Sequence, residues 1–331
     1  MHVVHKSRVP IQVIGYGSSG TSIFCQLLRE KLGVGIGTES QFVVRYYHAL
    51  SEYGDLDDDR NLQRLIADLS RERWFERNEK FGFSCSEEQI FNDVKQRTYR
   101  GVLDAVFSQL ANHLNAERWG DKTPDYVHDL PVLWELFPDA KYIHVVRDGR
   151  DVAHSVMSRY WGPKNIYTAA SEWTEQVSRV RDFLKTVPAD QQLEVRYEDL
   201  LAEPIKVFTE LIEFLEVDNR DGKVLDRIKQ TVPNELNREN CDKWKRSWSQ
   251  AQRLAYERIA CDVLRHYGYE TQLESRQTPR NGLAKLFWRL DNRLRKLAWR
   301  EYWSDNLYKA RLRVAYTTQK LRNALARLTS G

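Results

Sequence analysis

A segment rich in glycine and hydroxyl side chains lies near the start of the chain, where a short apolar run gives way to a helical pattern. It reads GYGSSGTS over residues 15–22 and fits the phosphate-loop pattern GxxxxGK[ST], except that Thr21 replaces the lysine. Glycines between a strand and a helix let backbone N–H groups turn inward around phosphate oxygens. The segment therefore predicts a phosphate-binding site, and an ordinary structural turn is the alternative that it leaves open.

A second candidate site residue, Arg147, directly follows the apolar run KYIHVV at residues 141–146. Enzymes that use ATP need the loop lysine to bridge the β- and γ-phosphates and an aspartate at a strand end to hold magnesium. This chain has Thr21 and Arg147 at those places. Because a guanidinium binds an anion directly, the two departures indicate a nucleotide bound without a metal ion.

The elements that must position these residues alternate between strands and helices. Apolar runs bounded by turn residues predict strands at 9–14, 34–36, 141–146 and 192–196, with a further strand ending at RWGDKTP, 118–124. Helical spacing predicts helices at 21–32, 90–114, 127–137, 151–159, 166–184 and 204–215. This alternation predicts an α/β three-layer sandwich with a central parallel sheet, whose ligands bind at the carboxyl ends of the strands. The charged residues 52–88 are expected to form a mobile insertion outside the core.

Composition bounds the class of protein. With 331 residues, 41% of them hydrophobic, most of the chain is too apolar to be disordered and long enough for one large domain or two. The four cysteines have no zinc-type spacing, so they are expected to be reduced thiols in a reducing compartment. The first ten residues lack a signal-peptide pattern. We therefore expect a cytoplasmic protein, peripheral to a membrane if its C-terminal part contacts one.

Four motifs, taken in order, resemble the sulfotransferases that use 3′-phosphoadenosine 5′-phosphosulfate (PAPS). They are the loop at 15–22, RWGDKTP, FPDAKYIHVVRDGRDVAHSV at 137–156 and LEVRYEDLLAEP at 193–204. The resemblance extends over about residues 10–270. It implies a phosphate-loop fold related to nucleotide kinases and sulfuryl transfer from PAPS to a hydroxyl or amine. It also implies 3′,5′-ADP (PAP) as the second product and no metal ion.

The resemblance also assigns cofactor contacts. The loop segment matches the part of the family that wraps the 5′-phosphosulfate with backbone amides and hydroxyls. Its five residues are Ser18, Ser19, Gly20, Thr21 and Ser22.

Five further residues match the contacts of the rest of the nucleotide. Arg147 and Ser155 resemble the pair that grips the 3′-phosphate, and Arg159, placed one helical turn beyond Ser155, resembles a second ligand of it. Guanidinium forks and hydroxyls suit a dianionic phosphate. Tyr197 resembles the residue near the nucleoside, and Lys243 resembles a late cofactor contact. The alternatives are solvated surface charges for the basic residues and a core aromatic for Tyr197.

Two residues resemble the catalytic groups. Glu39 follows the second predicted strand at a distance from the loop similar to that of the catalytic carboxylate in tyrosylprotein sulfotransferases, which implies a general base. Lys122 in GDKTP resembles the lysine that stabilises charge on the leaving phosphate. A surface carboxylate that caps a turn is the alternative for Glu39. His48, His128 and His154 are alternative bases by chemistry alone.

Ser18 is the main departure from the family pattern, because many members have Lys or Arg there. Either Lys122 with backbone amides compensates, or another basic residue does, or turnover is poor. A nucleotide-binding module without turnover is therefore a rival function, and an ATP-dependent phosphoryl transferase is a second. The acceptor stays open among sugar, lipid, tyrosine peptide and phenol, with residues 41–116 expected to shape its pocket.

The C-terminal part of the chain differs in charge from the rest. Residues 275–331 hold 14 basic and 3 acidic residues, a balance of +11, whereas residues 1–274 have a balance of −7. We expect a sulfotransferase domain at 1–274 and a basic amphipathic tail at 275–331, with a second helical segment at 306–328. Its apolar stripe is Leu283, Leu286, Leu290, Leu294 and Leu297.

The tail leaves several partners open. Its stripe could pack on the acidic body or in a homodimer, contact an anionic membrane, or bind a polyanionic partner. No nucleic-acid motif accompanies it.

Overall fold

Five short strands form one sheet in the order β2-β3-β1-β4-β5. β1 pairs in parallel with β3 and β4, and β2 pairs in parallel with β3, so that Ile11 lies opposite both Gly120 and Lys141. Every residue of β1, β2 and β3 is buried, as expected for a parallel sheet covered on both faces. The strands are β1 (Ile11–Ile14), β2 (Val34–Ile36), β3 (Arg118–Asp121), β4 (Lys141–Val146) and β5 (Gln192–Arg196).

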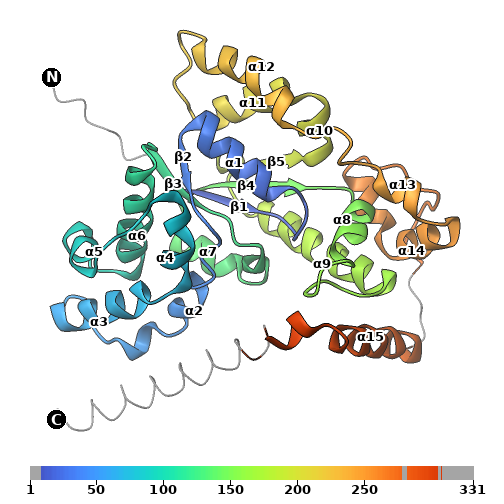
Figure 1. Ribbon diagram of the computed structural model, residues 1–331, viewed down its shortest axis with the longest axis horizontal. Helices are drawn as coiled ribbons and strands as arrows, with labels where there is room; N and C mark the ends of the chain where they lie inside the picture. The colour runs from blue at the N-terminus through green and yellow to red at the C-terminus, as the bar shows by residue number, and fades with distance from the viewer. Residues whose placement is uncertain (1–8, 278–281, 305–306, 308–331) are drawn as a thin grey trace. The chain divides into compact units, whose positions relative to one another are not determined.

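The computed structural model describes residues 9–277, 282–304 and 307 (Figure 1). It divides into two compact units. Unit 1 comprises Met1–Gly15, Gly20–Val145 and Val180–Leu236, and unit 2 comprises Tyr16–Ser19, Val146–Arg179 and Asn237–Gly331. The predicted boundary at residue 274 stays a prediction.

Unit 1 contains the sheet, apart from Val146 at the end of β4, with helices on both sides. The helix α1 follows β1 along the chain and packs against β2, as does α6. This confirms the predicted α/β architecture with a central parallel sheet. The helices of this unit are α1 (Thr21–Leu32), α2 (Val43–Tyr47), α3 (Asp59–Ser70), α4 (Arg73–Asn78), α5 (Glu87–Asp93), α6 (Tyr99–His113), α7 (Leu130–Leu136), α10 (Tyr197–Ala202), α11 (Pro204–Phe214) and α12 (Lys223–Glu235).

The prediction that residues 52–88 lie outside the core is wrong. Helices α3 and α4 fall in this range, and Leu62, Leu65, Leu69 and Trp74 belong to the main hydrophobic core of unit 1, each at most 1% exposed. The leucines recur at helical spacing among charged residues, so α3 has one apolar face and one charged face. The overall content of charged residues in this segment does not indicate the apolar face. Trp74 packs edge-on against Phe42 and Phe107.

The single helix predicted over 90–114 is two helices. α5 ends at Asp93, and α6 begins at Tyr99 with Thr98 as its N-cap, whose side chain accepts a hydrogen bond from the N–H of Gly101. The apolar pattern continues across the break because both helices pack on the same core.

Unit 2 is built around aromatic side chains. Its helices are α8 (Gly149–Val156), α9 (Ile166–Leu184, which continues into unit 1 from Val180), α13 (Lys243–Ser247), α14 (Gln250–His266) and α15 (Gly282–Leu297). Trp173 and Tyr256 are fully buried there. The buried Arg150 pairs with Asp148 at 2.7 Å and with Glu257 at 3.0 Å. These contacts fix the start of α8 against α14.

α8 ends earlier than predicted. Its last residue is Val156, and Arg159 lies in the turn that follows, where its N–H bonds to the Val156 carbonyl. Arg159 is therefore not one further helical turn on from Ser155.

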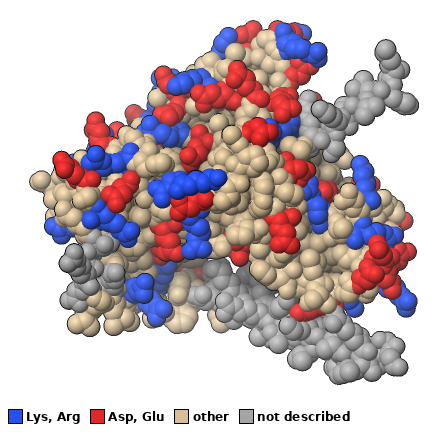
Figure 2. Space-filling model, turned by 180° about the vertical axis from the view of Figure 1, so that it is seen from behind, with Lys and Arg blue, Asp and Glu red and all other residues tan. Residues whose placement is uncertain are grey.

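None of the described helices is long and apolar enough to cross a membrane. Figure 2 shows Lys and Arg side chains interspersed with Asp and Glu over the described surface that faces the viewer. The predicted helix at 306–328 lies outside the described residues, Leu307 excepted.

Candidate active site

Residues 16–19 of the glycine-rich loop belong to unit 2. The N–H of Ser19 bonds to the carbonyl of Tyr16 at 3.0 Å, and Ser18 has a φ of +69°. Ser19 is 1% exposed, and its Oγ has no hydrogen-bond partner among the residues that the structure describes. Buried hydroxyls are almost always hydrogen-bonded, so this atom fits a site that a ligand completes.

The second half of the loop belongs to unit 1 and leads into α1. Gly20 is the N-cap residue with a φ of +88°, and a Cβ there would lie 2.2 Å from Cδ2 of Tyr197. Thr21 is buried and Ser22 is exposed. No side chain caps the start of α1, and its first turn contains no acidic residue. The N-terminus of this 12-residue helix therefore presents backbone N–H groups and a positive dipole end that suit an anion.

The predicted catalytic residues form an ion pair in unit 1. Lys122 follows β3, Glu39 follows β2, and the Lys122 Nζ lies 2.5 Å from Glu39 Oε1. These strands are neighbours in the parallel sheet, so their carboxyl ends place the two residues at the same edge. The lysine side chain is 9% exposed and that of the glutamate is 33% exposed. The Glu39 carboxylate is therefore partly accessible to solvent, whereas the Lys122 ammonium group next to it is largely buried.

A buried network beside this pair was not anticipated from the sequence. Ser40 Oγ donates to Asp121 Oδ2 at 2.8 Å, Thr123 Oγ1 donates to the same oxygen at 3.2 Å, and the Tyr126 hydroxyl lies 2.8 Å from Ser40 Oγ. The network joins the turn after β2 to the turn after β3, so it fixes the backbone of Glu39 and Lys122. Ser40 and Asp121 are sequence neighbours of Glu39 and Lys122, which is the one signal in the sequence that could have indicated them.

Burial raises the pKa of Asp121 to about 6, although the hydroxyls of Ser40 and Thr123 and the charge of Lys122 oppose the shift. The raised pKa makes the folded state bind a proton more tightly than the unfolded chain does. The corresponding stability is present below about pH 4 and is lost as the pH rises through about 6.

The Asp121→Asn variant is expected to remove this dependence, because an amide oxygen still accepts from Ser40. Its stability relative to the wild type should rise by about 2–3 kcal/mol between pH 4 and 7. Urea unfolding across this pH range measures the difference. A difference between the two proteins that stays constant with pH would contradict a protonated Asp121 in the folded state.

The predicted 3′-phosphate residues lie in unit 2. Arg147 is 5% exposed, and its guanidinium donates to the carbonyls of Ser18 at 3.0 Å and Asn240 at 2.7 Å. Ser155 is half-buried on α8, and Arg159 is exposed in the turn beyond it. Arg147 thus contacts the loop, whereas the backbone of Arg159 bonds within the turn that follows α8.

Asp151 lies in the first turn of α8 in unit 2, and its contacts could not be predicted from the sequence. Its carboxylate accepts hydrogen bonds from the N–H groups of Asp242 at 2.6 Å and Trp244 at 3.2 Å. These bonds hold the start of α13, where the half-buried Lys243 lies. Trp161 is another residue that the sequence did not single out. It is 43% exposed, and a Cβ on Gly17 would lie 2.9 Å from its ring.

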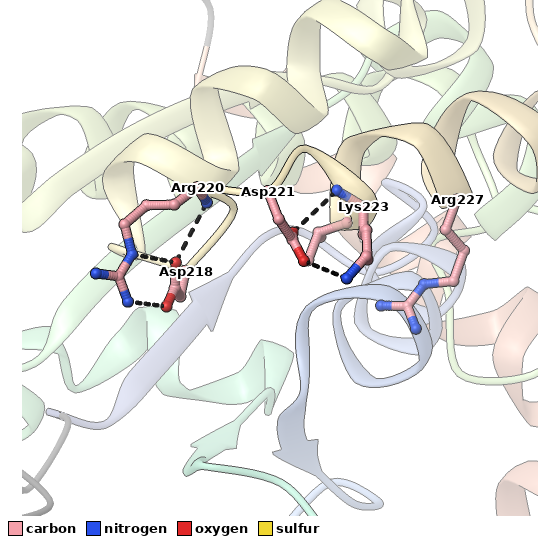
Figure 3. A pocket seen from close by; sticks show the side chains of 6 residues that line it. Asp218, Arg220, Asp221, Lys223 and Arg227 are labelled. Atoms are coloured by element: carbon pink, nitrogen blue, oxygen red, sulfur yellow. Dashed lines mark hydrogen bonds and ion pairs between the residues drawn. The ribbon is translucent and has the colours of Figure 1, made fainter.

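A surface hollow of about 580 Å³ lies between the end of α11 and α12 in unit 1 (Figure 3). Its lining includes none of the predicted site residues. Arg220 pairs with Asp218 at 2.6 Å and Lys223 pairs with Asp221 at 2.8 Å, so four of its five charged residues are paired. The fifth, Arg227, donates to the carbonyl of Lys31. We assign it no role.

The chain is similar to known sulfotransferases. The model of the sulfotransferase family matches residues 10–221. Protein-tyrosine sulfotransferase A of Caenorhabditis elegans is 28% identical over 133 residues, 39% of this chain and 34% of that protein. The protein-tyrosine sulfotransferase of Drosophila melanogaster is 28% identical over 133 residues, 37% of this chain and 26% of that protein. The chain thus spans about a third or less of the length of these relatives.

Solved structures of sulfotransferases are also similar to this chain. The sulfotransferase domain of the Synechococcus PCC 7002 olefin synthase is 26% identical with a TM-score of 0.47, covering 81% of this chain and 97% of that one. The sulfotransferase domain of the curacin biosynthetic pathway is 18% identical with a TM-score of 0.49, covering 80% and 100%. Because the family model matches well over half of its residues, the chain belongs to the sulfotransferase family.

Proposed function

We propose that this sulfotransferase takes the sulfuryl group from PAPS and transfers it to a hydroxyl group of an acceptor, releasing PAP. The observation that carries the proposal is the anion cradle of the glycine-rich loop. In unit 1 the start of α1 has, in the described structure, neither a capping side chain nor an acidic residue in its first turn. In unit 2 the buried Ser19 hydroxyl has no hydrogen-bond partner among the described residues. Because Thr21 replaces the phosphate-loop lysine, this cradle suits a phosphosulfate better than a metal-bound triphosphate.

The binding roles follow the family resemblance residue by residue. Residues 18–22 would hold the 5′-phosphosulfate, and Arg147, Ser155 and Arg159 would hold the 3′-phosphate. Tyr197 packs against Gly20 and would border the nucleoside, and Lys243 would add a late contact. The two carbonyl bonds use two of the five N–H donors of Arg147, so the guanidinium retains donors for a phosphate oxygen.

The chemical step would use the ion pair of unit 1. Glu39 would take the proton of the acceptor hydroxyl as that oxygen forms a bond to sulfur and the bond from sulfur to the bridging phosphate oxygen breaks. Lys122 would stabilise the negative charge that develops on the leaving phosphate. Since Ser18 supplies no charge, Lys122 is the cationic group that the resemblance offers for this role.

The acceptor is proposed only by class. The matched relatives are named as protein-tyrosine sulfotransferases, which favours testing a tyrosine peptide beside sugar, lipid and phenol acceptors. Residues 41–116 would shape the acceptor pocket. This segment includes buried aromatic side chains of α2, α4 and α6, which could support such a pocket.

The proposal includes a cytoplasmic location, peripheral to a membrane. All four cysteines are free, Cys25 and Cys261 among them buried. Unpaired cysteines are typical of proteins in a reducing compartment.

Two measurements test the proposed function. PAP should raise the melting temperature and ATP with Mg²⁺ should not, because a nucleotide that binds only the folded state stabilises it. Labelled PAPS should then transfer its sulfuryl group to one acceptor class of the panel. Stabilisation by ATP with Mg²⁺ alone would favour a phosphoryl transferase, whereas PAP binding without transfer to a cell extract would favour a nucleotide-binding module.

The Gly20→Ala variant is expected to bind PAP at least about tenfold more weakly. The new Cβ would overlap the Tyr197 ring, so that the ring or the start of α1 must move and displace the loop amides. Isothermal titration calorimetry measures the affinity.

Gly33→Ala is the matched control. Gly33 ends α1 with a φ of +62°, so an alanine there meets the same backbone strain, but no atom lies within 4 Å of its Cβ position. Equal losses in the two variants would attribute the effect to strain and contradict the cradle.

A further inference from the structure

The exposed apolar face of α15 is the feature that sulfuryl transfer leaves without a role. At about 3.6 residues per turn, six of its large apolar side chains share one side of the helix. Their exposed fractions run from 43% to 74%, although each would gain from burial. They are Leu283, Leu286, Phe287, Leu290, Leu294 and Leu297. We call these six residues the apolar strip.

The other side of α15 is held by unit 2. Asn292 is 8% exposed, and its Oδ1 accepts a hydrogen bond from the N–H of Lys164 at 2.7 Å. Asn165 Nδ2 donates to the Trp288 carbonyl at 2.9 Å and to Asp291 Oδ2 at 2.8 Å. The Trp288 ring stacks on Tyr167. The residues of unit 2 that make these contacts lie just before α9 or in its first turn. They hold α15 so that the apolar strip faces away from them.

Basic residues border the apolar strip on its free side. Arg289, Arg293 and Lys296 recur at intervals of four and three residues, which places them in one row along the helix, and Arg300 follows its end. The acid within α15, Asp291, lies on the held side and pairs with Arg295 at 2.7 Å. The exposed side of α15 therefore combines an apolar strip with a row of cations.

We propose that α15 binds the surface of an anionic lipid bilayer. The apolar strip would enter the boundary between headgroups and acyl chains, and the basic row would lie among the anionic headgroups. Trp299 and Trp303, 37% and 51% exposed, follow the helix and suit the polar–apolar interface. The held side keeps its contacts with unit 2, so binding requires no unfolding of α15.

The charge distribution favours a bilayer over a second copy of this chain. A symmetric dimer through the apolar strip would bring two basic rows together, within a segment whose balance is +11. An anionic surface complements the same row. The proposal does not depend on the proposed sulfuryl transfer.

Vesicle flotation of the full chain tests the proposal. The protein should float with vesicles of phosphatidylcholine and phosphatidylserine in about a 7:3 ratio, remain at the bottom with phosphatidylcholine alone, and lose binding as salt is raised. Failure to float with the anionic vesicles would overturn the proposal. So would light scattering that shows a dimer which the Leu290→Gln/Leu294→Gln variant converts to a monomer.

Three double variants separate the two contributions. Leu290→Gln/Leu294→Gln should lower the vesicle partition coefficient at least about tenfold by removing insertion. Arg289→Gln/Arg293→Gln should lower it about fivefold for each arginine. Arg220→Gln/Lys223→Gln removes the same net charge from exposed residues of unit 1 and should change it little. An equal loss in this control would overturn the assignment to α15, and the wild-type result stands even if a leucine variant misfolds.

Discussion

The Lys122→Ala variant is expected to lower kcat by at least about 100-fold, the cost of removing one preorganised donor from a developing charge. The lysine side chain is 9% exposed, so little water can replace its ammonium group. Ser18 stands at the position where many family members supply a second charge, which leaves the leaving phosphate more dependent on Lys122. Steady-state kinetics with PAPS and the acceptor found in the panel give kcat and KM separately.

Lys31→Ala is the matched control for Lys122→Ala. Lys31 is a lysine of unit 1 with a 10% exposed side chain, paired to Glu235 at 2.6 Å, so its loss breaks a comparable ion pair away from the predicted site residues. We expect the two variants to lose similar stability and only Lys122→Ala to lose turnover. A kcat of Lys122→Ala within about threefold of the wild type, far from the hundredfold cost of a lost donor, would remove this residue from the mechanism.

The strands were predictable because burial on both faces leaves continuous apolar runs. β2 and β4 begin and end at the predicted residues. The edge strand β5 does so too, although Val195 is its one buried residue. Helix ends were less predictable, since caps and tertiary contacts decide them. Thr98 begins a new helix inside an uninterrupted apolar pattern, and α8 stops before Arg159. The burial of α3 was missed because its four charged residues are as many as the four apolar residues that form its buried face.

The candidate site was predictable where it depends on motifs. The ends of neighbouring parallel strands meet, so Glu39 and Lys122 were both expected beside the sheet edge, and the structure pairs them. The network of Ser40, Asp121 and Tyr126 was not predictable, because a hydrogen bond between residues some 80 positions apart depends on packing. The role of Asp151 was not predictable, since its partners at residues 242 and 244 belong to a segment without a motif.

The Glu39→Gln variant is expected to lower kcat by about 10²- to 10⁴-fold with a weakly acidic acceptor, the usual contribution of a general base. The amide keeps the shape of the side chain and an oxygen that can accept from Lys122 Nζ, which lies 2.5 Å from Oε1 in the wild type. The variant therefore removes the base while leaving the predicted charge stabiliser in place. Glu30→Gln, at an exposed glutamate of α1 bonded only locally to Gln26 in the described structure, should leave kcat unchanged.

Acceptors of graded acidity distinguish the two catalytic roles. A more acidic phenol needs less help to lose its proton, so the defect of Glu39→Gln should shrink steadily along a series of increasingly acidic phenols. The defect of Lys122→Ala should persist across the same series, because the charge on the leaving phosphate does not depend on the acceptor's proton. A Glu39→Gln defect that stays constant along the series would instead make Glu39 a positioning residue for Lys122. In that case the proton would have to leave through another group or through water.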